Sequence, residues 1–146
     1  MKVRIDVVRW IRSNVLQPVP HELILMDMVE IYRASVAESR ERLGYRAKYV
    51  ADIVFKEPPD SAGFIIVKIP PEMKTSPHSH GILSEVFVMM GKTKMGVADT
   101  LYDLDEGDVV VVEPREFHWF ETPNGPDVDV IAIKMPNLKE DKIEAK

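Results

Sequence analysis

From about residue 46 onward, the chain consists of short segments in which apolar and polar residues alternate. A period of two is the pattern of β-strands, because successive side chains point to opposite faces. Turn-forming stretches rich in proline, glycine and aspartate separate the segments, and this spacing predicts a β-sandwich or barrel. The expected strands cover residues 49–55, 64–69, 84–90, 92–97, 108–113, 117–121 and 128–134.

The first 45 residues show a different pattern. Apolar residues at helical spacing predict a short helix over residues 6–15, although alternating apolar residues leave a strand there as the alternative. After two prolines, a longer helix is predicted over residues 21–43, in which Glu38 and Arg42 form an i, i+4 pair and Gly44 follows as a stop. Its apolar first half either packs against the barrel or a partner subunit, or is a strand.

These patterns predict a single domain with three parts. Residues 1–45 form a helical extension that packs on the barrel or on a partner, residues 46–136 form the β-barrel, and residues 137–146 form a charged C-terminal tail. A chain of 146 residues is of ordinary single-domain size, and a hydrophobic content of 45% is enough for one core.

Composition and charge narrow the classes of function. The net charge of −5 argues against nucleic acid as a partner, because phosphate binding needs a basic face. No apolar run approaches the ~20 residues of a membrane span, and the charged N-terminus does not resemble a signal peptide. We therefore expect a cytoplasmic protein without a membrane partner. The absence of cysteine excludes disulfides and thiolate ligands, and many charged residues with few amides are typical of thermophilic proteins.

Four residues in the barrel region are of the metal-ligating type: His78, His80, Glu85 and His118. His78 and His80 are two residues apart, so on a strand they point to the same face. Glu85 and His118 lie on other predicted strands, which can bring all four into one interior. Imidazole suits zinc, iron and nickel, and a carboxylate adds affinity for iron or manganese. The set predicts one divalent transition metal ion (iron, manganese, zinc or nickel), with hydrogen-bonded, metal-free histidines as the alternative.

The order and spacing of these residues resemble the two sequence motifs of the cupin superfamily. His78-x-His80-x4-Glu85 matches the ligands of the first motif, and the distance from Gly107 to His118 is that of the second. The resemblance implies an all-β fold, the double-stranded β-helix or jelly-roll barrel. It also implies a homodimer, because cupin domains commonly pair.

The chain departs from the cupin motifs at turn residues. Pro71 stands where the first motif begins with glycine, and Arg115 stands where the second motif has its second glycine. Pro114 falls one place late. These departures concern loop geometry and leave the four ligands in place.

The inward face that the ligands share is otherwise apolar. Alternation places Phe87, Met89 and Phe120 on it, and we expect them to line a pocket for a small-molecule ligand. Glu85 is the one carboxylate among the ligands, so it is also the candidate catalytic residue, as a proton shuttle. The resemblance implies a metal-dependent enzyme, with oxygenase-type chemistry favoured. A sugar or sugar-phosphate isomerase or epimerase, or a non-catalytic binding protein, is the alternative, because one fold hosts many functions.

Two further sets of charged residues bear on the site. Three glutamates either orient the His118 ring through its second nitrogen or are surface carboxylates. They are Glu113, Glu116 and Glu121. A sugar phosphate would need an inward lysine or arginine. Three lysines lie on predicted strands whose inward face the sequence does not define: Lys68, Lys94 and Lys134.

Overall fold

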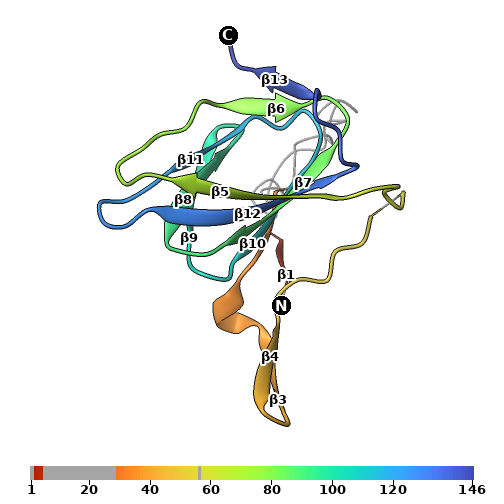
Figure 1. Cartoon of the computed structure of the whole chain (residues 1–146), viewed down its shortest axis with the longest axis vertical. Coiled ribbons are helices and arrows are strands. Elements are labelled where there is room, and N and C mark those ends of the chain that lie inside the picture. Colours follow the sequence, from red (N-terminus) through yellow and green to blue (C-terminus); the bar gives the residue numbers. More distant parts are fainter. Residues whose placement is uncertain (1, 5–28, 56) are drawn as a thin grey trace, which may run out of the picture.

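The computed structural model describes residues 2–4, 29–55 and 57–146. The predicted helix over residues 6–15, and the first part of the one over residues 21–43, lie outside the described residues. The regular secondary structure of the described chain is almost entirely β-strand, which confirms the all-β fold class (Figure 1). Within it, no helix has the length and apolar character that a membrane span requires.

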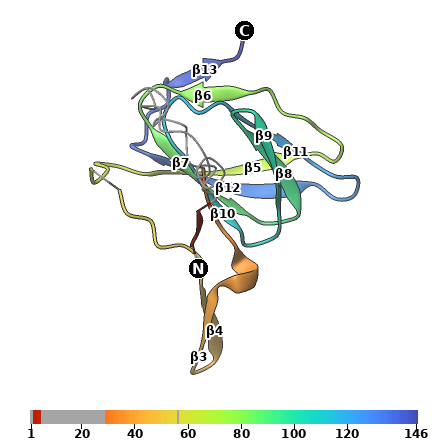
Figure 2. The ribbon, with the colours of Figure 1, turned by 180° about the vertical axis from the view of Figure 1, so that it is seen from behind.

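Two antiparallel sheets make up the barrel. The six-stranded sheet contains, in spatial order, β1 (Lys2–Arg4), β2 (Glu30–Tyr32), β10 (Val109–Val112), β7 (Ser84–Met89), β12 (Val128–Met135) and β5 (Gly63–Ile69). The five-stranded sheet contains β13 (Lys142–Glu144), β6 (His78–His80), β11 (His118–Glu121), β8 (Thr93–Val97) and β9 (Thr100–Leu104). Figure 2 shows the same two sheets from behind.

The main core lies between these two sheets. Phe87 and Met89 of β7 point inward beside Val130 of β12, and they meet Met95 and Phe120 of the opposite sheet in one buried cluster. The inward side chains alternate with outward ones, as the period-two pattern requires. The expected inward positions of Phe87, Met89 and Phe120 therefore agree with the structure.

The six-stranded sheet is apolar on its outer face too. All four residues of β10, Val109–Val112, are buried, because Val50, Ile53 and Phe55 cover the outer side of the sheet. A strand covered on both faces has no need to alternate. The strand predicted over residues 49–55 is wrong beyond Tyr49, since this segment covers the sheet and does not join it.

The helix predicted over residues 21–43 is wrong in its described part. Residues Glu30–Tyr32 form β2, which pairs with β1 and β10 and has Ile31 and Tyr32 buried. A 3-10 turn, η3 (Ala34–Val36), leads to a separate hairpin of β3 (Glu38–Arg42) and β4 (Tyr45–Tyr49), which projects from the barrel (Figure 1). Strand pairing overrides the local helical signal here.

The charged residues that suggested a helix lie on the first strand of the hairpin. Glu38 pairs with Arg40 at 2.6 Å, two residues along the same strand face, and Arg42 stands at the end of β3. Gly44, predicted as a helix stop, lies in the hairpin turn with φ of 83°. A positive φ of this size is the conformation that glycine adopts without strain.

Asp108 anchors the segment before the hairpin to the barrel. The residue is 1% exposed, and its carboxylate accepts hydrogen bonds from the Ala34 N–H at 2.8 Å and the Asp105 N–H at 3.0 Å. It also pairs with the Arg33 guanidinium at 2.7 Å. Asp108 therefore holds two separate segments of the chain together.

The C-terminal tail is charged and its strand is exposed, yet it joins the barrel. β13 pairs with β6, placing Lys142 beside His80 and Glu144 beside His78. Before β13, the Asp141 carboxylate accepts hydrogen bonds from the Ile82 and Leu83 N–H groups at 2.8 and 2.9 Å. The C-terminal residues therefore cover the open side of β6, the strand that carries two of the candidate ligands.

Trp119 lies on the outer face of the five-stranded sheet, opposite in direction to His118. Its ring occupies the space above Gly96, where an added Cβ would lie 2.1 Å from the indole. The indole N–H donates to the Glu121 carboxylate at 2.9 Å, and the Lys74 ammonium lies 5.2 Å from the ring centroid. These contacts hold the indole in one orientation.

Candidate metal centre

The structure brings the four predicted ligands together. His78 and His80 come from β6, Glu85 from β7 and His118 from β11, where His118 is the cross-strand partner of His78. One ligand atom from each residue lies within 4.8 Å of all the others. His80, Glu85 and His118 are buried, and His78 is partly exposed. The cluster is therefore a compact, mostly enclosed set of three imidazoles and one carboxylate.

The buried atoms of the cluster face one another without hydrogen bonds. Glu85 Oε2 lies 3.1 Å from His80 Nε2 and 3.0 Å from His118 Nε2. Among the described residues, none of these three atoms has a hydrogen-bond partner. Buried polar atoms in proteins are normally satisfied, and a cation or a shared proton between these three atoms would satisfy them.

The other nitrogen of two imidazoles is already engaged. His118 Nδ1–H donates to the Glu116 carbonyl at 2.9 Å, and His78 Nδ1–H donates to the Ser76 carbonyl at 3.3 Å. In the neutral ring this leaves the lone pair on Nε2. For His118, that lone pair faces the Glu85 carboxylate, which is itself an acceptor, so a cation between them would remove the repulsion.

Of the three glutamates around His118, Glu113 is exposed, as the surface alternative predicts, whereas Glu116 is buried. Glu116 does orient His118, but through its backbone carbonyl, while its carboxylate accepts the Glu113 N–H at 2.7 Å. The Glu113 carboxylate accepts the Ser84 hydroxyl at 3.2 Å, and Glu121 pairs with Trp119. None of the three carboxylates is recorded in a hydrogen bond to the His118 ring in the described part of the chain.

The protonation states favour a divalent cation. Burial lowers the pKa of His78 to about 4, and burial also lowers the pKa of His80. Burial opposes ionisation of Glu85, but the contact with His118 and the charge of His80 bring its pKa below the ordinary value. At neutral pH this gives neutral His78 and His80 and an ionised Glu85, the states that metal ligation requires. The donor set thus fits a transition metal ion.

The metal-free protein should lose stability when the pH falls from about 6.5 towards about 4. Folded His78 and His80 resist protonation, so the unfolded chain binds more protons once the pH is below the ordinary histidine pKa of about 6.5. Glu85 adds a further loss below its ordinary value of 4.5. Denaturant midpoints measured across this range test the expectation, with His78→Gln as the variant whose slope should be smaller. A flat profile from pH 7 to about 4 would contradict it.

The three predicted pocket residues lie in the core beside the cluster. Phe87 is 5.5 Å from His118 and 5.3 Å from Phe120, measured between ring centroids. The exposed fractions of Phe87, Met89 and Phe120 are 3%, 0% and 6%. Phe87 lies against the cluster, Phe120 packs on Phe87, and Met89 lies further along β7 in the same core. Their contact with a substrate stays a prediction.

Arg115 shows why the motif has glycine at its position. It adopts φ of 70°, and its N–H donates to the His80 carbonyl at 2.7 Å. The turn between β10 and β11 therefore keeps the left-handed backbone that glycine adopts freely, at a cost of roughly 1–2 kcal/mol for another residue. The departure from the motif does not displace His80 or His118 from the cluster.

Lys134 is the neighbour of the site that sequence reasoning could not place. It is the cross-strand partner of Glu85, and paired residues of antiparallel strands share a face. Lys68 and Lys94 instead point outward and lie within ion-pair distance of Asp129 and Asp103. Alternation along β12 shows that Lys134 lies on one face of the strand but not which face. The pairing of Lys134 with Glu85 on β7 identifies it as the inward face.

The comparisons with known proteins concern structure. No protein-family model matches the sequence, and neither does any curated protein. A dTDP sugar isomerase from Desulfovibrio desulfuricans superposes with a TM-score of 0.59 at 10% identity, over 91% of this chain and 88% of that one. A cupin protein from Bacteroides fragilis gives 0.50 at 16% identity, over 67% and 90%.

A third similar solved structure is an enzyme that catalyses a different reaction. An oxalate decarboxylase from Lactobacillus farciminis gives a TM-score of 0.52 at 19% identity, over 57% of this chain but only 26% of that larger one. At such identities the likeness shows the fold and does not choose among these reactions. Two facing antiparallel sheets, the clustered motif residues and these structural relatives together show that the chain has the cupin fold, the double-stranded β-helix.

Proposed function

We propose that the protein is a metal-dependent enzyme acting on a small organic molecule. One divalent transition metal ion would be held by His78, His80, Glu85 and His118. The observation that carries the proposal is the set of buried, unpaired acceptor atoms around Glu85 Oε2. A divalent cation at this point would satisfy all of them at once.

The ion and the residues around it would have different roles in the reaction. The bound ion would supply Lewis-acid or redox chemistry, and open coordination positions would admit a substrate. Glu116 fixes the ring of His118 through its carbonyl, and Phe87 excludes water beneath the cluster. Glu85 Oε2 lies between two imidazoles, so Oε1 is the atom that we propose carries a proton. Oxygenase-type chemistry is favoured because the ion can supply the reactivity itself.

Metal analysis tests the proposal directly. Protein purified without added metal should contain about one transition metal ion per chain. Chelation should lower the melting temperature and reloading should restore it, because an ion at 100 times its Kd stabilises the folded state by about 2.7 kcal/mol. Protein that contains no metal, and gains no stability from any of the four candidate ions, would overturn the proposal.

A sugar or sugar-phosphate isomerase is the second candidate. The observation in its favour is Lys134, an inward cation beside Glu85 of the kind that a phosphate needs. Oxygen uptake with candidate enols, against interconversion of sugar phosphates, separates the two reactions in the metal-loaded protein. The metal-free protein is the control for both assays. Turnover of neither class would favour a binding protein without catalysis.

A further inference from the structure

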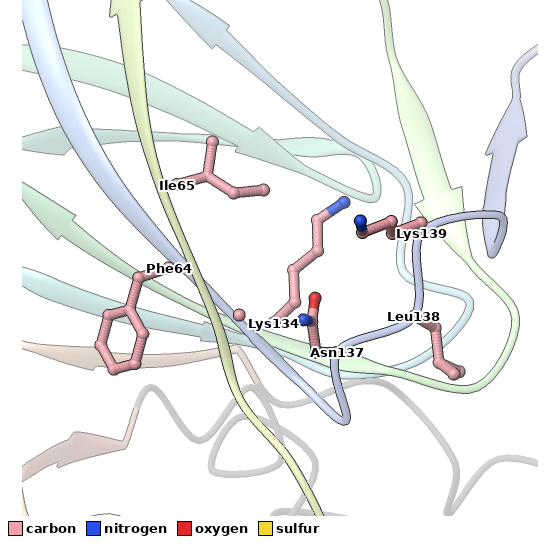
Figure 3. A pocket seen from close by; sticks show the side chains of 7 residues that line it. Phe64, Ile65, Lys134, Asn137, Leu138 and Lys139 are labelled. Atoms are coloured by element: carbon pink, nitrogen blue, oxygen red, sulfur yellow. The ribbon is translucent and has the colours of Figure 1, made fainter.

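A pocket of about 400 Å³ lies at the end of β12, between β5 and residues 137–139 (Figure 3). Its polar groups come from Lys134, Asn137 and Lys139, and its apolar wall includes Ile65 and Leu138. Pockets of roughly 300–1,000 Å³ with an apolar wall and a few polar groups are the usual form of a small-molecule site. The cluster of four ligands does not line this pocket, so it is a separate feature of the molecule.

The pocket lies next to the metal centre. Lys134 is paired with Glu85 on β7 and with Gly63 on β5, so its side chain starts on the same inward face as Glu85. Burial lowers the pKa of His80 and the charge of Lys134 adds to that lowering, whereas in Glu85 burial raises the pKa and the charge of Lys134 is one of the effects that lower it. Its ammonium is therefore within electrostatic reach of the cluster, yet no ion pair within 4.0 Å joins it to Glu85.

Two positive charges share this pocket. Figure 3 shows the side chains of Lys134 and Lys139 directed into the same space. In the part of the chain that the structure describes, no carboxylate is recorded in an ion pair with either ammonium. Several other lysines do have such a partner: Lys68, Lys74, Lys94 and Lys142. Like charges in one hollow repel, and an anion between them would offset the repulsion.

The third polar group is held by close packing. A Cβ at Gly63 would lie 2.2 Å from Asn137 Oδ1, so the amide occupies room that only glycine leaves on β5. The Asn137 N–H donates to the Ser61 hydroxyl at 2.9 Å, which ties this loop to the segment before β5. The amide of Asn137 is thus placed at the wall of the pocket, where its NH2 group is available as a donor.

We propose that this pocket binds the anionic group, a carboxylate or a phosphate, of a small organic substrate. Lys134 and Lys139 pair with the anion, Asn137 donates to it, and the apolar part of the molecule lies against Ile65 and Leu138. The far end of the substrate then reaches the metal cluster. That last point rests on the proposed function, whereas binding of the anion requires only the pocket.

Binding of simple anions to the metal-free protein tests the proposal. Benzoate probes a carboxylate with an apolar body, and inorganic phosphate probes the other anion. Calorimetric titration should show that at least one of them binds. Its affinity should fall about tenfold in Lys134→Met and in Lys139→Met, since each loses a charge-assisted hydrogen bond. Lys48→Met is the matched control: it removes the same charge from the exposed strand β4, and its affinity should equal that of the wild type.

The two lysine variants allow the proposal to be tested even if one of them does not fold. Lys139 is exposed, so Lys139→Met leaves the fold intact even if Lys134→Met does not. Lysine-dependent binding of benzoate assigns a carboxylate, and lysine-dependent binding of phosphate assigns a phosphate. Failure of both anions to bind, or affinity unchanged in Lys139→Met and in folded Lys134→Met, overturns the proposal. Lysine-dependent binding by protein that takes up no metal would overturn the proposed function and leave the anion pocket standing.

Discussion

Replacing His118 with alanine should abolish stoichiometric metal binding. His118 is 1% exposed, its Nε2 lies 3.0 Å from Glu85 Oε2, and the Glu116 carbonyl fixes its ring. Removing a residue that only supports a ligand typically lowers metal affinity by roughly 10- to 100-fold, so removing the ligand itself should cost more. Metal content after purification and a competition titration with a chelator measure the loss.

His21→Ala is the matched control for this variant. His21 is the one histidine of the sequence that is not among the predicted ligands, and its replacement should leave the metal content at the wild-type value. Because His118→Ala also opens a buried space, the melting temperature of the metal-free variant should be compared with its value after metal is added. A rise equal to that of the wild type would show that His118 is not a ligand.

Replacing Asp108 with alanine should destabilise the fold by about 2–4 kcal/mol. The carboxylate is buried and satisfies the N–H groups of Ala34 and Asp105 and the Arg33 guanidinium. Its loss leaves the Ala34 and Asp105 N–H groups without this partner, whereas Arg33 keeps the Asp103 carbonyl at 2.6 Å. An unsatisfied buried donor costs about 1–3 kcal/mol. Denaturant unfolding of the metal-free protein measures the change.

Asp103→Ala provides the comparison for Asp108. Its side chain is 81% exposed and reaches Lys94 only at 3.7 Å, so its removal should change the stability by less than about 1 kcal/mol. Equal effects of the two substitutions would show that Asp108 does not connect the barrel to the segment before the hairpin. The two variants carry the same change in charge, so a difference between them reports burial.

Strand parity made the centre of the molecule predictable. Alternation alone places Glu85 and Phe87 on one face, and the distance from Gly107 to His118 brings the third histidine to the same end of the barrel. Even the replacement of a motif glycine by Arg115 left the turn unchanged, because the tertiary contact with His80 outweighs the local strain.

Other features depend on long-range contacts that the sequence does not display. Residues Glu38–Arg42 read as a helix because charges at i, i+4 suit a helix, but an exposed strand accepts the same charges. Strand β9 was missed because its turn uses Ala98 at φ of 52°, without a glycine or proline to mark it. The inward position of Lys134 follows from its register with Glu85, which alternation within one strand cannot supply.

The packing of Trp119 has a consequence for experiments in solution. The indole is held over Gly96 and bonded to Glu121, and it is the next residue in the chain after His118. The chain has only one other tryptophan, Trp10. In a Trp10→Phe variant, fluorescence would come from a single fixed indole beside a candidate ligand, and quenching by iron or nickel would follow the filling of the site. The protein thus carries its own optical reporter, which would allow affinities to be read without a label.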